Sequence, residues 1–288
     1  MSEPLHGVSS AVEHTGLTRG FPASFVRALG NWFVSVLPTN STLLYRFCGK
    51  VVDRYNGDNN CDMATNGELR LMRSALLNTT VVFDVGANVR DWTSEALKIN
   101  PTAHYHCFEP SPTTYTSLAA RALPGNVRLN NVGLGDVEGH RPLFIFGDGY
   151  GVNSLYNRRG TDAVTQCQET VCIETLDGYC KKNAVQRIDF IKLDVEGHEL
   201  FVLRGGECLL QQGQIGVIQF EYGGTYIDAR VLLKDIWEYV QAMNPNYSFY
   251  KLYPSGLRLV PAYRQTLETF QYSNWVIMHQ NSCKWALG

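Results

Sequence analysis

Carboxylate and amide side chains stand at the ends of five apolar segments of the sequence. The residues in these places are Asp84, Glu109, Asn131, Asp194 and Glu221. Carboxylates accept hydrogen bonds from hydroxyl and ammonium groups, and they can take a proton from a reacting hydroxyl. Because ligands of open α/β sheets bind outside the carboxyl ends of the strands, this pattern predicts one shared crevice. The alternative is that single members cap helices, which Ser111 and Asp194 are also placed to do.

The turn at residues 86–91 lacks the glycines of a nucleotide-binding loop. A dinucleotide site needs G-x-G-x-x-G, whereas the chain reads GANVRD here, and no Gly-Lys-Ser/Thr loop is present. Asp91 near the start of the next helix would also repel a pyrophosphate. Glu109 closes the next strand, where its carboxylate can accept hydrogen bonds from two ribose hydroxyls, and Asp84 can hold loop amides or a cationic amino group. The arrangement suits a ligand with a ribose and an ammonium but no phosphate, such as S-adenosylmethionine.

From residue 80 onward, short apolar runs alternate with segments of helical periodicity. The runs expected as strands are 81–86, 104–110, 127–134, 142–146, 169–176, 188–195, 215–223 and 273–279, with a hairpin at 247–261. The segments expected as helices are 25–37, 68–77, 91–100, 111–123, 177–183, 200–210 and 231–243. This alternation predicts a parallel α/β sheet with right-handed crossovers, and the terminal hairpin predicts an antiparallel edge. Residues 53–67 are rich in turn-forming residues and are expected to form a loop.

The composition excludes several classes of protein. The chain of 288 residues has 44% apolar and 18% charged residues, which is typical of a folded protein of one or two domains. The formal net charge of -2 gives no basic excess, so nucleic acid is not an expected partner. No uncharged apolar stretch reaches about 18 residues, so no membrane span is expected, and the N-terminus lacks the pattern of a secretory signal. Eight cysteines without a CxxC pair favour reduced thiols and a cytoplasmic location.

Three ordered blocks of the sequence resemble the FkbM-type methyltransferases. They are VFDVGAN at 82–88, FEPSP at 108–112 and DFIKLDVEGHE at 189–199. The resemblance covers about residues 66–280 and implies a class I methyltransferase, Rossmann-like α/β fold. That fold has a mostly parallel seven-stranded sheet with an antiparallel edge strand. Residues 66–288 would form this domain, and residues 1–65 would form a helical extension that caps the acceptor site or mediates homodimer formation.

The same resemblance implies S-adenosylmethionine as the cofactor. The expected reaction is O-methylation of a hydroxyl on a small-molecule natural product or a sugar-like acceptor. Many N-methyltransferases carry an Asn-Pro-Pro-like motif after the fourth strand, and Asp194-Val195-Glu196 in that place favours oxygen as the acceptor atom. An N-methyltransferase and a catalytically inactive binding or scaffold protein of the same fold are the alternatives. The broken glycine pattern disfavours a Rossmann oxidoreductase.

The resemblance also assigns the residues that bind the cofactor. They are Asp84, Gly86, Ala87, Asn88, Glu109, Ser111, Asn131 and Asp194. The first four would line the methionine end, Glu109 would hold the ribose, and Asn131 would lie near the adenine. The family usually has glycine where this chain has Arg90. The Arg90 side chain could point to solvent, pair with a pocket acid or weaken cofactor binding.

The loop at 194–198 carries the expected catalytic residues, His198, Asp194 and Glu196. Transfer of a methyl group to a hydroxyl requires removal of a proton, and the ordinary pKa of histidine, about 6.5, makes His198 the first candidate for proton acceptor. A histidine in a first helical turn could instead cap or pack. Asp194 and Glu196 could orient His198, bind acceptor hydroxyls, or hold Mg or Ca together with Glu221, but their spacing requires no metal and none is expected. Glu221 and Tyr222 are the expected acceptor-binding residues.

Overall fold

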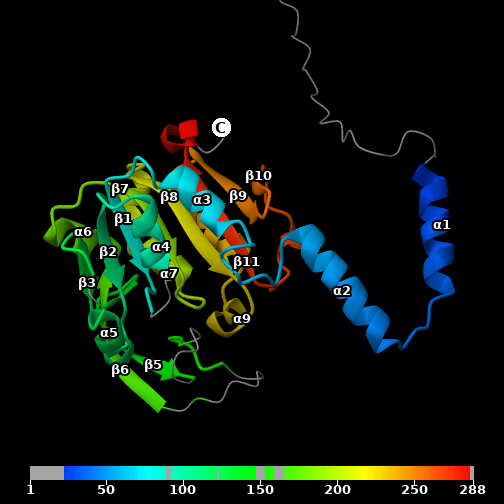
Figure 1. Cartoon of the computed structure of the whole chain (residues 1–288), viewed down its shortest axis with the longest axis horizontal. Coiled ribbons are helices and arrows are strands. Elements are labelled where there is room, and N and C mark those ends of the chain that lie inside the picture. The colour runs from blue at the N-terminus through cyan, green and yellow to red at the C-terminus, as the bar shows by residue number, and fades with distance from the viewer. Residues whose placement is uncertain are drawn as a thin grey trace, which may run out of the picture. The chain divides into compact units, whose positions relative to one another are not determined.

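The computed structural model describes residues 23–88, 92–121, 123–146, 153–158, 165 and 167–285 (Figure 1). The chain divides into two compact units, residues 1–50 and 51–288. Residues 51–65, assigned to the N-terminal extension from the sequence, belong to the larger unit. There Asp58 forms an ion pair with Lys251, and the amide of Asn59 donates to the carbonyl of Tyr272 at 2.8 Å. The role of the extension as a cap or dimer contact stays a prediction.

An eight-stranded sheet forms the centre of the larger unit, with the strand order β10-β9-β11-β8-β7-β1-β2-β3. The strands are β1 (Val81–Val85), β2 (His104–Phe108), β3 (Val127–Asn130), β7 (Ile188–Leu193), β8 (Ile215–Tyr222), β9 (Tyr247–Tyr253), β10 (Gly256–Val260) and β11 (Ser273–His279). From β3 to β8 the neighbouring strands pair in parallel. β11 pairs antiparallel with β8 and β9, and β10 pairs antiparallel with β9. The expected mostly parallel, Rossmann-like sheet is confirmed.

The expected antiparallel edge is present, because β10 of the hairpin forms the edge and runs opposite to the parallel strands. The number of strands differs from the expected seven: the hairpin at 247–261 supplies two strands, β9 and β10, so the sheet has eight. A further antiparallel strand, β11, lies inside the sheet. Local patterns identify strands, but strand order depends on long-range pairing, such as that of Trp275 with Phe220 on one side and Lys251 on the other.

Helices cover both faces of the main sheet. Those of the larger unit are α3 (Glu68–Ala75), α4 (Trp92–Ile99), α5 (Pro112–Ala119), α6 (Leu176–Lys182), α7 (Glu199–Arg204), α8 (Glu207–Gln211), α9 (Thr225–Ala229) and α10 (Leu233–Met243), with the 3-10 helices η1 (Gln265–Leu267) and η2 (Gln280–Trp285). α3, α4 and α5 share an apolar cluster with Val82 and Phe190. α6 to α10 share another with Phe83 and Ile191. Because neighbouring strand residues point to opposite faces, burial of both faces explains the nearly continuous apolar run of β7.

A second, three-stranded sheet has the order β4-β6-β5, with bounds β4 (Gly133–Gly135), β5 (Gly139–Ile145) and β6 (Cys167–Thr175). The run 127–134, expected as one strand, breaks after Asn130, and β4 pairs with β6 instead of continuing in the main sheet. A Cβ added at Gly135 would lie 2.9 Å from Nε2 of His198. The second sheet therefore lies directly against the loop that follows β7.

Two helices precede α3: α1 (Ala23–Ser35) and α2 (Thr42–Asn56). α1 matches the helix expected at 25–37 and ends before Pro38, which cannot continue a helix without strain. α2 has no counterpart among the expected helices, and its last residues fall in the expected loop at 53–67. The helical pattern reaches Asn56 because Phe47, Val51 and Tyr55 recur every four residues. Among the described residues, we find no helix with the length and apolarity needed to cross a membrane.

Candidate functional site

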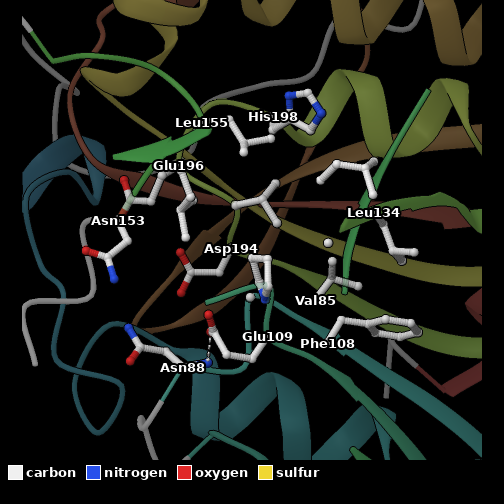
Figure 2. Close-up of a pocket in the computed structure, with 16 residues that line it drawn as sticks. Val85, Asn88, Phe108, Glu109, Leu134, Asn153, Leu155, Asp194, Glu196 and His198 are labelled. Carbon is white, nitrogen blue, oxygen red and sulfur yellow. Dashed lines mark hydrogen bonds between the residues drawn. The ribbon is translucent and has the colours of Figure 1, made fainter. Parts of the chain in front are cut away.

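A cavity opens at the carboxyl ends of β1, β2 and β7, next to the second sheet (Figure 2). Its apolar wall includes Val85, Phe108, Leu134, Leu143, Leu155 and Ile173. Its polar wall includes Asn88, Glu109, Asn153, Asp194, Glu196 and His198. Figure 2 shows the carboxylates and amides gathered on one side, and His198 near Leu134 and Leu155. A crevice is thus present where the strand-end pattern predicts one.

Glu109 connects the two loops that border this cavity. One carboxylate oxygen accepts the amide of Asn88 at 2.9 Å, and the other accepts the amide of Ser111 at 2.9 Å. Burial raises the pKa of Glu109 to about 7, although these two backbone hydrogen bonds act in the opposite direction. Each carboxylate oxygen has a further lone pair, so Glu109 can hold both loops and still accept hydrogen bonds from a ligand.

The turn after β1 is held close to the end of β7. The amides of Gly86 and Ala87 both donate to the carbonyl of Phe108, at 3.0 and 2.9 Å, and the amide of Asp194 donates to the carbonyl of Val85 at 2.9 Å. Gly86 has φ of 85°, and a Cβ there would collide with the carbonyl oxygen of Asp194. This glycine is therefore needed for the contact between two strand ends, in addition to its place in the cavity wall.

Four of the expected cofactor residues are absent from the described cavity wall. Asp84 is buried and accepts the hydroxyl of Thr93 at 2.6 Å, because its position in β1 directs its side chain toward α4. Ala87 packs in the apolar cluster on that face. Ser111 caps α5, and Asn131 donates to the carbonyl of Glu109 at 2.9 Å.

Asp84, Ala87, Ser111 and Asn131 therefore position the loops around the cavity. Gly86, Asn88, Glu109 and Asp194 do line the cavity. For the four residues that do not line the cavity, direct contact with a cofactor stays a prediction. Arg90 lies outside the described residues.

A second cavity adjoins the first and shares part of its wall. Asp194 and Glu196 line both cavities, and the second also contains Arg158, Glu221, Tyr222 and Tyr272. The hydroxyl of Tyr272 donates to Glu221 at 3.2 Å, and burial raises the pKa of Glu221 well above its ordinary value. The hydroxyl of Tyr222 donates to Glu268 at 2.9 Å, so it is already engaged in a protein contact. The two expected acceptor-binding residues thus lie together, beside the expected cofactor cavity.

Lys192 and Asp194 form a buried ion pair at the end of β7. The ammonium lies 2.9 Å from the Asp194 carboxylate, and the two side chains are 5% and 7% exposed. Burial alone lowers the pKa of Lys192, but the carboxylates of Asp194 and Asp84 raise it above its ordinary value. The ammonium therefore carries its charge beneath the wall that separates the two cavities.

Glu199 fixes the shape of the loop that carries Glu196. Its carboxylate accepts the amides of Val195 and Gly197, both at 3.1 Å. Glu196 itself has φ of 53°, a conformation that few residues other than glycine adopt. Burial raises the pKa of Glu199 to about 8. This buried carboxyl thus holds a strained turn in the position that exposes Glu196 to both cavities.

His198 is held by packing and by one hydrogen bond. Its Nδ1 lies 2.7 Å from the hydroxyl of Tyr156, and its ring stacks on Phe201 with centroids 4.7 Å apart. Its Nε2 is buried against Gly135 and has no hydrogen-bond partner among the described residues. Burial lowers the pKa of His198 to about 4, so the ring is neutral near pH 7. His198 lines the first cavity but is not among the residues that line the second.

The chemistry of the first cavity fits the cofactor expected from the sequence. Phe108, Leu134 and Ile173 offer an apolar surface for an aromatic base, and Glu109 offers oxygen acceptors for a sugar diol. Asn88 and Asp194 line the same cavity and supply polar groups beside a charged amino-acid tail. This donor set matches the adenine, ribose and methionine portions of S-adenosylmethionine.

Sequence reasoning missed several residues of the site. Tyr272 precedes β11, and nothing in its local pattern reveals that the strand order brings it to Glu221. Leu143 and Ile173 belong to the second sheet, which the sequence analysis did not separate from the main sheet. Glu199 was visible as the last residue of the third block, but its contacts with the loop amides depend on side-chain geometry.

The sequence model of the "Methyltransferase FkbM domain" matches residues 84–247, which is more than half of the chain. A relative from Haloferax volcanii, named hexuronic acid methyltransferase AglP, is 28% identical over 171 residues, covering 58% of this chain and 66% of the relative. A relative from Sinorhizobium fredii, named 2-O-methyltransferase NoeI, is 28% identical over 140 residues, covering 44% of this chain and 57% of the relative. The chain thus matches less than two thirds of the length of either relative.

Among solved structures, the plantazolicin methyltransferase BpumL in complex with SAH matches at a TM-score of 0.39 and 9% identity, covering 83% of this chain and 91% of that one. A putative caffeoyl-CoA O-methyltransferase from Staphylococcus aureus matches at 0.40 and 11% identity, covering 89% and 98%. Likeness at this level is too weak to support an argument about the site. The family match and the topology of the sheet are sufficient to assign the family and the fold. The chain belongs to the FkbM methyltransferase family, and its larger unit is a class I methyltransferase domain with S-adenosylmethionine as its cofactor.

Proposed function

We propose that this protein transfers a methyl group from S-adenosylmethionine to a hydroxyl of a small, sugar-like acceptor of natural product biosynthesis. The observation that carries the proposal is the wall shared by the two cavities. Asp194 and Glu196 border the cavity that fits the cofactor and also the adjoining cavity. An acceptor hydroxyl in the second cavity would therefore meet the reactive end of the cofactor next to two carboxylates. The name 2-O-methyltransferase, carried by one relative, supports oxygen as the acceptor atom.

Residues in and next to the shared wall have separate roles in the proposed reaction. The cofactor supplies an electrophilic methyl group on a sulfonium. Glu109 holds the sugar of the cofactor, and the ion pair with Lys192 holds the Asp194 carboxylate in its orientation. Glu196 takes the proton as the acceptor oxygen forms its bond to the methyl carbon and the carbon–sulfur bond breaks. We assign His198, the first candidate from the sequence, to positioning the loop, because it lines the first cavity but not the second, where the acceptor would bind.

The second cavity favours a neutral acceptor with several hydroxyl groups. Its described lining contains the carboxylates of Asp194, Glu196 and Glu221, with Arg158 as a single cation at 3.9 Å from Glu196. The oxygens of these groups accept hydrogen bonds from hydroxyls. Lys192 and Arg158 are already paired with Asp194 and Glu196, so neither is placed to bind an anionic substrate. We therefore expect an acceptor preference that differs from the one in the name of the hexuronic acid methyltransferase.

A cytoplasmic location and a small-molecule acceptor are parts of the proposal. The seven cysteines whose side chains the structure describes are all free thiols, which supports a reducing compartment. The net charge of -2 supports a small molecule rather than nucleic acid as the acceptor.

Calorimetric titration followed by an acceptor screen tests the proposal. S-adenosylmethionine and its demethylated product should bind at micromolar concentrations, about -8 kcal/mol. Methyl transfer should then be measured on matched hexosides, hexuronates and amino sugars, with the methylated atom located by NMR. We expect a higher kcat/KM for neutral hexosides than for hexuronates. Methylation at nitrogen would favour the N-methyltransferase, and cofactor binding without transfer to any acceptor would favour the binding protein.

A further inference from the structure

The helix α1 carries an apolar face that the described structure leaves exposed. Phe25, Leu29, Trp32 and Phe33 have the i, i+4, i+7, i+8 spacing that places side chains on one face of a helix. Their exposures are 49%, 54%, 62% and 58%. Large apolar side chains gathered on one exposed face mark a surface that binds a partner.

The helix α2 repeats this arrangement and adds a row of positive charges. Phe47, Val51 and Tyr55 form an apolar row with exposures of 66%, 52% and 76%, and the described part of α2 contains no buried residue. Arg46, Lys50 and Arg54 each precede one member of that row by one residue. Each basic residue and the apolar residue after it recur every four residues, about one helical turn. The basic row therefore runs beside the apolar row along the helix.

The charge of this segment is opposite in sign to that of the chain. Between residues 23 and 56 the basic residues are Arg27, Arg46, Lys50 and Arg54, and Asp53 is the single acid. The whole chain has a net charge of -2. The positive charge is thus concentrated in the segment that also exposes aromatic side chains.

We propose that α1 and α2 bind the surface of a membrane that contains anionic lipids. An amphipathic helix with Trp and Phe on one face and Arg or Lys on the other lies in the plane of the interface, with its apolar face at the boundary of headgroups and acyl chains. The basic row of α2 would then meet the lipid phosphates. A second copy of the chain is a poorer occupant, because it would bring the same cations with Asp53 as their one acidic counterpart.

Vesicle sedimentation of the full-length protein tests this inference without involving catalysis. The two probes are vesicles of phosphatidylcholine alone and of phosphatidylcholine mixed with phosphatidylserine. We expect tighter binding to the mixed vesicles, weakened by added salt. Replacing Arg46, Lys50 and Arg54 with glutamine should weaken binding to mixed vesicles by about fivefold for each charge removed. The variant Leu29→Ser/Phe33→Ser should weaken binding to both kinds of vesicle.

Two control variants separate this surface from exposed side chains elsewhere. Ile227→Ser/Leu259→Ser changes apolar residues that are 60% and 53% exposed outside the two helices, and it should leave vesicle binding unchanged. Asp53→Asn should tighten binding to the mixed vesicles. Circular dichroism verifies that each variant is folded. Absence of binding, or equal binding to both kinds of vesicle, overturns the proposal. So does a dimer in lipid-free buffer that Leu29→Ser/Phe33→Ser dissociates, because a second copy would then cover the apolar faces.

Discussion

The ammonium of Lys192 lies 2.9 Å from the carboxylate of Asp194, beneath the wall shared by the two cavities. An ion pair withdrawn from water stabilises a fold weakly, since desolvation offsets much of the attraction. Removal of one partner is costly because it leaves a buried charge alone. The pair therefore holds Asp194 in place more than it stabilises the sheet.

Replacing Lys192 with methionine should lower the free energy of unfolding by about 3–5 kcal/mol, because Asp194 loses its buried partner. Urea unfolding followed by circular dichroism measures this loss. The double variant Lys192→Met/Asp194→Asn should recover most of it. A single variant as stable as the natural protein would contradict the assignment of the pair as buried and coupled.

Glu109→Gln should weaken cofactor binding and remove its pH dependence. The pKa of Glu109 is raised to about 7, so the carboxylate that accepts the ribose hydroxyls is lost as the pH falls through that value. Calorimetry between about pH 6 and about pH 8 should show affinity falling toward tenfold per unit below the pKa in the natural protein. Identical pH profiles for the natural protein and the variant would remove Glu109 from the cofactor site.

Glu109 should make the free energy of unfolding depend on pH in the direction opposite to cofactor affinity. The folded pKa exceeds the unfolded value of about 4.3, so the native state holds the proton more tightly. The contribution of this group to stability therefore falls as the pH rises from about 4.3 to about 7. Glu109→Gln should flatten that part of the stability profile.

Glu196→Gln should lower kcat by a factor of about 100 to 10 000, far more than it changes cofactor affinity, because it removes the proposed proton acceptor and keeps the shape of the side chain. Single-turnover transfer from labelled cofactor measures the chemical step. Glu238→Gln is the matched control, since this carboxylate is exposed on α10 and outside both cavities. A small change in kcat for Glu196→Gln would leave Asp194 as the proton acceptor.

His198→Asn should lower stability more than it changes the pH profile of kcat. The imidazole is neutral well above its pKa of about 4, and its contacts are Tyr156 and Phe201. Tyr156→Phe removes the same hydrogen bond from the other side and should give a similar, smaller effect. A collapse of kcat with unchanged stability would return His198 to the role of proton acceptor.

Gly86→Ala should destabilise the domain, because an alanine there combines a strained positive φ with a collision against the backbone of Asp194. Gly125→Ala is the control, since a Cβ at Gly125 meets nothing within 4 Å. Thermal unfolding of the two variants compares the cost. Equal unfolding temperatures would show that the turn after β1 moves away from β7 without loss.

The sequence predicts this fold well because each parallel strand has a local signature. The β7 run is apolar on both faces, and Ser111 caps its helix as its residue type suggests. The crevice follows from the same pattern, since Glu109 and Asp194 follow β2 and β7, the two strands that flank β1. Strand order is not local, so the interior place of β11 and the separate second sheet could not be derived.

The chemistry of single residues was harder to predict than their location. Asp84 ends β1 as a candidate ligand, yet the alternation of the strand directs it to Thr93. His198 has the ordinary pKa of a base in water, but burial against Gly135 and Phe201 makes it a weak one. Both outcomes depend on packing against elements that are distant in the chain. The spacing of residues in the sequence does not reveal such packing.

The wall formed by Asp194 and Glu196 borders both cavities, so occupants of the two would be thermodynamically linked through it. A charged occupant of one cavity would change the electrostatic potential that the other presents. Such coupling is reciprocal, so a donor that raises affinity for the acceptor must itself be bound more tightly, by the same factor, when the acceptor is present. A cationic donor and its neutral product differ in charge at this wall, so turnover itself changes how strongly the methylated acceptor is retained.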